Sequence, residues 1–280
     1  MSYDLFLNFA PAVKKNVLVE FFHKRQNYTL NEGGIVYSND DTGVYFMLHF
    51  KENRSLFSSV TIPCLHICIN YLRPSFFALE AEIEIAAITA HFPCRIDDPQ
   101  AEAESGGETF EGFLRAWNAR NRQAVAAMQA DGKAPVQVAT LPRRELEESW
   151  RWNYARREGA GHPLRDQFLP RIIYARVGGR VGTAVIWGNA VAARLPRVDF
   201  VFVGRTETGT GTARPVVGVV PWEEFASVLE NAGFAQGEDG FELNYASAPE
   251  GIVEFVRTVE AADMTTVVPL AADRIVDADV

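Results

Sequence analysis

The chain has 280 residues, of which 48% are hydrophobic, and its 27 basic and 36 acidic residues give a formal net charge of −9. A chain this apolar can bury a large core, which excludes global disorder, while three cysteines and 21 glycines without period exclude disulfide-rich and collagen-like proteins. The negative charge argues against nucleic-acid binding by phosphate neutralisation and against attraction to anionic membranes. We therefore expect a globular protein that binds neither nucleic acid nor membrane.

Residues 1–15 contain no basic segment ahead of an apolar one, and Asp4 and Asn8 interrupt their apolar positions. This pattern is not that of a signal peptide, and no run of about 18 apolar residues predicts a membrane span. An odd number of cysteines is typical of a reducing compartment. We expect a cytoplasmic protein.

The first third of the chain alternates strand and helix signals. Apolar residues at every second position indicate strands, whereas the spacing after Pro11 indicates a helix. The turn Asn39-Asp40-Asp41-Thr42-Gly43 predicts a hairpin, because its residues accept turn geometry. The predicted strands span residues 3–9, 35–38, 44–50 and 56–72, the last bulged at Pro63, and the helix spans 11–24.

A second helix is predicted to begin after Pro74-Ser75 and to end before Pro93. Glu80, Glu82 and Glu84 lie mostly off its predicted buried stripe. That stripe consists of Phe76, Phe77, Leu79, Ile83, Ala86, Ala87 and Ala90.

Residues 97–111 hold six acids and no base around Ser105-Gly106-Gly107, which is typical of a mobile, solvated loop. Helices are predicted over 113–128 and from Pro142 to Arg157. The second helix interleaves arginines and glutamates with tryptophans. Its mixed charge favours a salt-bridged helix with Trp150 in the core over a surface for single-stranded nucleic acid.

The last third is again rich in strands. Gly178-Gly179 predicts a hairpin between residues 171–177 and 180–187, and we expect a strand over 198–205 to continue it as a meander. The remaining predicted elements are strands over 216–220, 241–245 and 265–270 and helices over 221–232 and 249–259.

These elements predict an α+β fold with two mainly antiparallel sheet-containing parts joined by a helical middle segment. The predicted parts are residues 1–98, a connector over 99–162 that includes the acidic loop, and a β-meander part over 163–280. The three parts can also pack as one compact unit.

Cys64, His66 and Cys68 recur at every second position, so they share one face of a predicted strand. A strand rises about 3.3 Å per residue, which places Cys64 and Cys68 about 13 Å apart. One zinc ion could bind neighbours from this trio but hardly all three. Nothing in the sequence activates a thiol as a nucleophile. We expect a half-buried strand, no metal site and no cofactor.

Other candidate sites are weaker. Residues 206–212 are rich in Gly and Thr but lack the lysine of a phosphate-binding loop, and no other linear catalytic motif occurs. The acids of 97–111 could serve acid–base chemistry or bind Mg²⁺, but a loop interrupted by Gly and Ser is a poor wall for a pocket. We therefore predict no catalytic residue.

Four segments carry a resemblance to a known group of proteins. They are Tyr3-Asp4-Leu5-Phe6, Tyr37-Ser38-Asn39-Asp40-Asp41-Thr42-Gly43-Val44-Tyr45-Phe46, Arg73-Pro74-Ser75-Phe76-Phe77 and Trp150-Arg151-Trp152-Asn153. Together they resemble small α+β bacterial proteins encoded beside secreted polymorphic toxins. The resemblance implies an immunity protein and assigns no catalytic residue.

The leading hypothesis is a non-catalytic cytoplasmic protein that occludes a basic partner, such as a toxin domain. Acidic loops would steer that partner and give specificity. The predicted partner-binding residues are Asp97, Asp98, Glu102, Glu104, Glu108, Glu111, Asp40 and Asp41, with the 206–212 tip as a secondary candidate.

Two alternatives stay open. One is an enzyme of unrecognised family with a pocket between the two sheet-containing parts, around His66 or His162. The other is a structural subunit of a larger assembly, which would expose an extended apolar surface.

Overall fold

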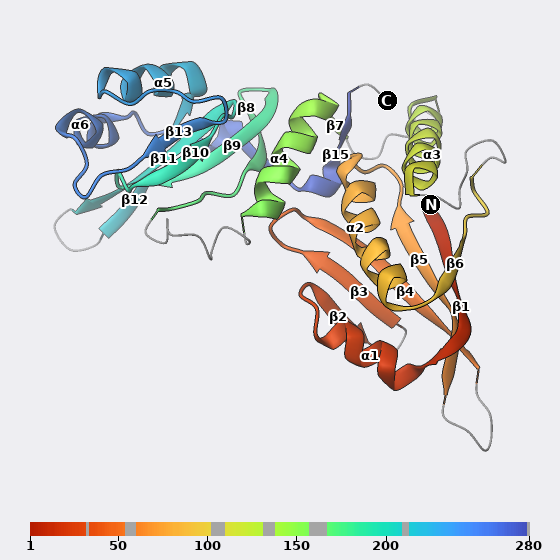
Figure 1. The fold of residues 1–280 in the computed structure, drawn as a ribbon. Helices are drawn as coiled ribbons and strands as arrows, with labels where there is room; N and C mark the ends of the chain where they lie inside the picture. The colour runs from red at the N-terminus through yellow and green to blue at the C-terminus, as the bar shows by residue number, and fades with distance from the viewer. Residues whose placement is uncertain are drawn as a thin grey trace. The chain divides into compact units, whose positions relative to one another are not determined.

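A computed structural model describes residues 1–31, 34–53, 60–101, 110–130, 138–156, 167–208 and 213–278. Within these ranges the chain forms six helices and fifteen strands in several mainly antiparallel sheets, which confirms the predicted α+β fold (Figure 1). Contacts between residues divide the chain into two units. The first comprises Met1–Leu146 and Ala272–Val280, and the second comprises Glu147–Ala271. The predicted boundaries lie instead after residues 98 and 162.

The first unit is built on an antiparallel sheet with the strand order β2-β3-β4-β5-β1-β6. Alternate residues of its central strands, such as Leu5 and Ile67, are buried on the face that α2 covers. The elements are β1 (Ser2–Lys14), α1 (Lys15–His23), β2 (Tyr28–Asn31), β3 (Gly34–Asn39), β4 (Val44–Asn53), β5 (Thr61–Asn70), α2 (Phe76–His91), β6 (Cys94–Asp97) and α3 (Phe110–Ala130).

The N-terminal strand is longer than its sequence pattern predicts. It continues to Lys14, where Val13 pairs with Ile62 and Lys14 pairs with Thr61 of β5. The helix predicted over 11–24 therefore begins only at Lys15. Pairing with a distant strand outweighs the local helical spacing after Pro11.

The hairpin of β3 and β4 is confirmed. Gly43 adopts a φ of 76°, which favours glycine, and its N–H donates to the Asn39 carbonyl at 2.7 Å. The strand predicted over 56–72 is described from Thr61 to Asn70, with Pro63 inside it, and residues 54–59 lie outside the described ranges.

The predicted buried stripe of α2 is largely wrong, since only Phe76 and Phe77 of its seven predicted residues are buried. Glu80 and Glu84 are buried against the sheet, whereas Ile83 is 39% exposed. The glutamates tolerate burial because polar side chains from the sheet satisfy them. Glu80 accepts hydrogen bonds from the Tyr37 hydroxyl at 2.6 Å and from the Asn39 amide at 2.8 Å.

Glu84 lies one turn further along α2 and has partners of its own. It accepts a hydrogen bond from the Tyr28 hydroxyl at 2.7 Å and forms an ion pair with Arg25 at 2.6 Å. Burial and the neighbouring Glu84 raise the pKa of Tyr28, so this hydroxyl stays a donor at neutral pH.

A short strand from the end of the described chain completes the first unit. β15 (Ile275–Asp277) pairs in parallel with β7 (Ala139–Leu141). Asp277 then accepts hydrogen bonds from the Ser75 N–H at 2.9 Å and the Ser75 hydroxyl at 2.8 Å, at the N-terminus of α2. The Asp277 carboxylate thus satisfies an amide at the start of the helix.

Burial raises the pKa of the Asp277 carboxyl, although the bonds from Ser75 oppose the shift. A raised pKa in the folded state means that this group favours folding most below its unfolded pKa and loses that contribution as pH rises. We compare the free energy of unfolding of the wild type with that of Asp277→Asn. The stability of the wild type relative to this variant should decrease as pH rises from about 4. Urea titrations of both proteins across pH measure this difference. An increase with pH would contradict the assignment.

The second unit contains the sheet β12-β11-β9-β8-β14 and a separate strand pair, β10 with β13. Helices α5 and α6 pack on β11 and β12 (Figure 1). The elements are β8 (Ile173–Val177), β9 (Arg180–Gly188), β10 (Ala193–Pro196), β11 (Phe200–Thr208), β12 (Ala213–Pro221), α5 (Trp222–Asn231), β13 (Gly240–Leu243), α6 (Glu250–Thr258) and β14 (Val267–Leu270). The division between the units falls within α4 (Arg143–Ala155), where Trp150 is buried as predicted.

The predicted meander of the second unit is wrong. The hairpin of β8 and β9 forms around Gly178-Gly179, but β11 pairs with β9 in parallel. The chain between them leaves the sheet as β10, which pairs with the later strand β13. After β10, the chain enters the sheet again as β11, which runs in the same direction as β9.

None of the helices in the described ranges is long and apolar enough to cross a membrane.

Candidate functional site

The acids predicted to bind a partner occupy different environments. Asp97 ends the edge strand β6 and is exposed. Asp98 instead accepts hydrogen bonds from the Tyr3 hydroxyl and from the backbone N–H groups of Gln100 and Ala101, the latter two at 3.0 Å. Its carboxylate therefore organises the chain after β6. Glu102, Glu104 and Glu108 lie outside the described residues, as does the side chain of Glu111.

The two aspartates of the β3–β4 hairpin are also unlike one another. Asp40 is exposed, whereas Asp41 is only 8% exposed. The Asp41 N–H donates to the Asn39 side chain at 3.1 Å, which holds this residue in the turn. Asp40 is thus the better placed of the two for a partner. In the secondary candidate 206–212, residues 209–212 lie outside the described ranges.

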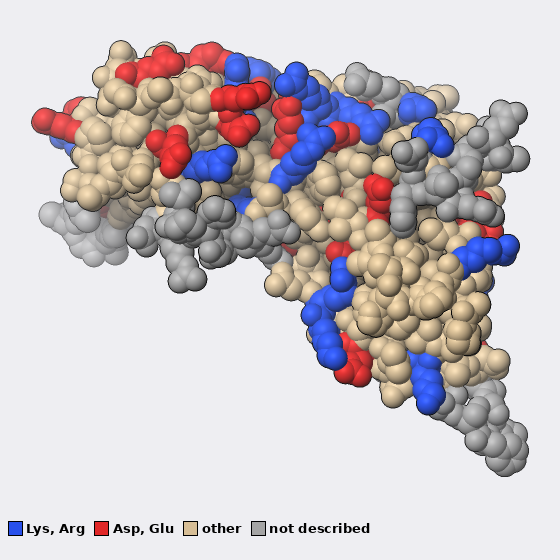
Figure 2. Space-filling view, in the orientation of Figure 1, with Lys and Arg blue, Asp and Glu red and all other residues tan. Residues whose placement is uncertain are grey.

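A more acidic surface, which the sequence analysis missed, lies on the second unit. Residues 222–263 contain ten acids and a single base, Arg257, and all ten acids are exposed. Figure 2 shows acidic side chains over α5 and α6. We call this the 222–263 surface, and its acids are Glu223, Glu224, Glu230, Glu238, Asp239, Glu242, Glu250, Glu254, Glu260 and Asp263. A running count of charge along the chain would have found it.

Two ion pairs lie on this surface. Glu254 contacts Arg257 at 2.7 Å, which lowers the pKa of Glu254, and Asp239 contacts Arg194 at 3.5 Å. Val253 is 47% exposed between Glu250 and Glu254. Arg194 and Arg257 offset only part of the ten acids, so the surface stays negative at neutral pH.

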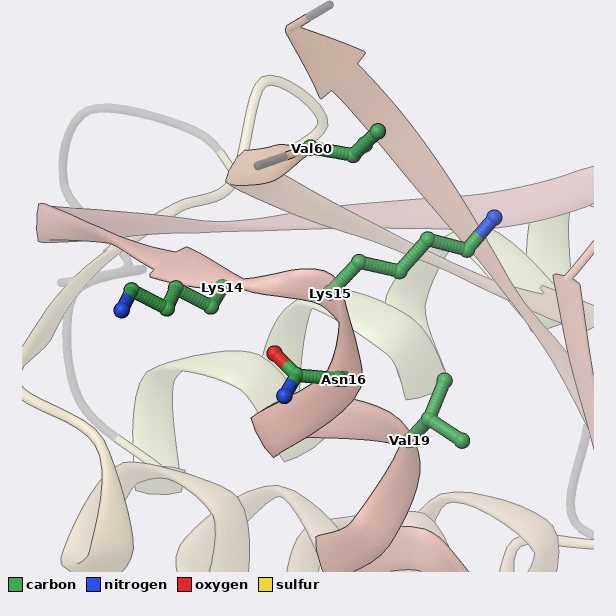
Figure 3. A pocket seen from close by; sticks show the side chains of 5 residues that line it. All are labelled: Lys14, Lys15, Asn16, Val19 and Val60. Atoms are coloured by element: carbon green, nitrogen blue, oxygen red, sulfur yellow. The ribbon is translucent and has the colours of Figure 1, made fainter. Parts of the chain in front are cut away.

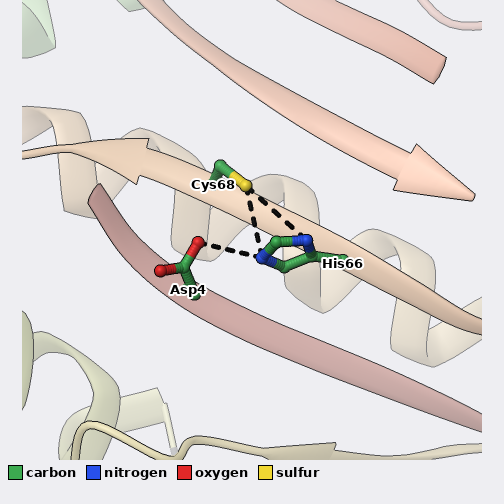
Figure 4. Close-up of side chains that lie close together, drawn as sticks. All are labelled: Asp4, His66 and Cys68. Carbon is green, nitrogen blue, oxygen red and sulfur yellow. Dashed lines mark hydrogen bonds and ion pairs between the residues drawn. The ribbon is translucent and has the colours of Figure 1, made fainter. Parts of the chain in front are cut away.

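A second cluster lies on the sheet face of the first unit opposite α2. Asp4 of β1 is directly opposite Cys68 of β5, and His66 lies two residues from Cys68 on the same face. The His66 Nε2 atom is 2.9 Å from Asp4 Oδ1 and 3.3 Å from Cys68 Sγ (Figure 4). One ligand-type atom from each residue lies within 4.8 Å of the other two.

Neighbouring side chains hold this cluster. Phe6 stacks on the His66 ring at 4.6 Å between centroids, and the His49 ring lies 5.8 Å from it. Burial and the contact with Asp4 raise the pKa of the Cys68 thiol to about 12. In the absence of a bound cation, Cys68 is therefore protonated at neutral pH and a poor nucleophile.

A hollow lies at the start of α1, between Lys14, Lys15, Asn16, Val19 and Val60 (Figure 3). Lys15 forms an ion pair with Glu52. These lining residues include no carboxylate, histidine or thiol, and the polar side chains of the hollow are two lysines and Asn16. Of the histidines proposed for an enzymatic pocket, His66 belongs to the cluster described above and His162 lies outside the described residues.

Comparisons of this chain with protein-family models, with curated proteins and with solved structures find no match.

Proposed function

We propose that this chain is a non-catalytic protein-binding protein whose 222–263 surface docks a partner with a basic face. The supporting observation is that all ten acids of residues 222–263 are exposed, while this range contains one base. Such a surface accelerates encounter with a basic protein and rejects acidic ones. Exposed Val253 among the glutamates offers an apolar contact within the charged surface.

The resemblance to immunity proteins encoded beside polymorphic toxins extends this proposal. The partner is then a toxin domain with a basic face, and binding occludes that face. Asp97 and the acids predicted in the loop 97–111 form a second candidate surface, on the first unit.

Three double variants with equal changes in charge separate these surfaces. Glu223→Lys with Glu250→Lys alters the 222–263 surface, and Asp97→Lys with Glu104→Lys alters the loop. Glu20→Lys with Glu148→Lys, at exposed glutamates outside the candidate surfaces, is the matched control. The tagged full chain is used to capture partners from a lysate of its source organism at low and high ionic strength, and the captured proteins are identified by mass spectrometry.

We expect the wild type and the control to retain one basic protein at low salt and to lose it at high salt, because salt screens exposed charges. The Glu223/Glu250 variant should retain it at least about tenfold less well. Loss confined to the Asp97/Glu104 variant would place the interface on the loop and contradict the proposed surface. If neither the charge-reversing substitutions nor the ionic strength changed the amount of protein captured, the proposed electrostatic binding would be contradicted.

A further inference from the structure

We propose that Asp4, His66 and Cys68 form a zinc site with one coordination position open to solvent. This inference is independent of the proposed protein-binding function. It begins with strand pairing, because the register of β1 and β5 places a carboxylate directly opposite a thiol. The imidazole two residues away reaches the same point from the same face (Figure 4).

The distances fit a shared ion. Bonds of about 2.0–2.3 Å from zinc place neighbouring ligand atoms of a tetrahedral site about 3.3–3.6 Å apart. The His66 Nε2 atom already lies 2.9 Å from Asp4 Oδ1 and 3.3 Å from Cys68 Sγ. All three ligand-type atoms lie within 4.8 Å of one another, so they are close enough for their side chains to share one ion.

The donor set favours zinc among common divalent ions. A thiolate and an imidazole suit a borderline-soft cation, whereas Mg²⁺ and Ca²⁺ require oxygen ligands. As zinc binds, the Cys68 thiol loses its proton to solvent and a bond forms between zinc and Sγ. Asp4 and the thiolate together neutralise the charge of the ion.

The surroundings orient the ligands. Phe6 stacks on His66 with only 12° between the ring planes, which fixes the plane of the imidazole. The Ser2 hydroxyl lies 3.3 Å from the Asp4 carboxylate, and the Gln100 side chain accepts from the Asp4 N–H. Such outer partners hold metal ligands in place.

The site is also accessible. The side chains of His66 and Asp4 are 24% and 31% exposed, so an ion can enter from solvent. Three protein ligands leave the fourth tetrahedral position to water, as in zinc sites that exchange a ligand.

Cys64 provides a matched control. It lies on the same face of β5 at the same distance in sequence from His66, but the residues directly opposite it are Asn8 and Lys51, and neither is a carboxylate. Cys64→Ser should therefore leave zinc binding unchanged. Cys68→Ser and Asp4→Asn should weaken it by at least about 100-fold, because each removes a direct ligand.

The experiment titrates Zn²⁺ into the reduced, chelator-treated full chain by calorimetry. Elemental analysis then gives the stoichiometry, with one ion per chain expected. Co²⁺ added to the same protein should give a thiolate-to-cobalt charge-transfer absorption that persists in Cys64→Ser and is absent in Cys68→Ser. Circular dichroism shows whether each variant is folded.

Failure of the wild type to bind Zn²⁺ would overturn the proposal. So would binding that is equally tight in folded Cys68→Ser, or a cobalt absorption lost in Cys64→Ser.

Discussion

Replacing Glu80 with alanine should lower the free energy of unfolding of the first unit by about 2–4 kcal/mol. Glu80 is fully buried and accepts hydrogen bonds from Tyr37 and Asn39, which are themselves buried. Without the carboxylate these two donors have lost their acceptor in a place that water does not reach, and the missing side-chain atoms leave a cavity.

Two further variants test this explanation. Tyr37→Phe removes one donor and keeps the acceptor, so it should cost only about 1 kcal/mol. Glu82→Ala, on a less buried side of α2, should cost less than Glu80→Ala. Urea unfolding followed by circular dichroism gives the free energies, and amide hydrogen exchange in α2 identifies the unit that is affected. Equal losses in Glu80→Ala and Glu82→Ala would show that the buried network is not the cause.

Replacing Gly240 with alanine should destabilise the second unit by about 2–4 kcal/mol. Gly240 has a φ of +131°, which side chains rarely adopt, and it pairs with Pro196. A Cβ atom there would lie 2.1 Å from the Leu195 carbonyl oxygen and 2.9 Å from the Arg197 nitrogen. Both are backbone atoms, so the strands β10 and β13 would have to separate.

Gly251→Ala is the matched control, and we expect it to increase the free energy of unfolding where Gly240→Ala decreases it. Gly251 lies in α6, and a Cβ atom there meets nothing within 4 Å. Alanine favours helix over glycine, so this variant should gain up to about 1 kcal/mol. Thermal and urea unfolding of both variants measure the difference. A Gly240→Ala protein as stable as the wild type would show that the β10–β13 pair tolerates a side chain at this position.

The elements that the sequence predicts well are those specified by neighbouring residues. The hairpins at Asn39–Gly43 and Gly178-Gly179 form because their turn residues accept the required backbone angles. By contrast, the burial of Glu80 depends on Tyr37 and Asn39, which lie about forty residues earlier. The parallel pairing of β9 and β11 depends on where the later strand β13 lies. Helical spacing and strand alternation carry no information on such distant partners.

The same distinction applies to the candidate sites. Alternation along one strand predicts that His66 and Cys68 share a face, and this is confirmed. The contribution of Asp4 requires the register of β1 against β5, which the sequence pattern alone does not give. The 222–263 surface is different, since its charge is visible in the sequence and only its exposure required the structure.

The return of β15 to the first unit has a consequence for biosynthesis. Because residues 275–277 pair with β7 and Asp277 bonds to Ser75, the second unit is an insertion within the first. During translation every residue of the second unit leaves the ribosome before β15 does. The second unit can therefore fold while the first still lacks its closing strand and the carboxylate at the start of α2. The order of folding then differs from the order of synthesis, and the segment made first is the one completed last.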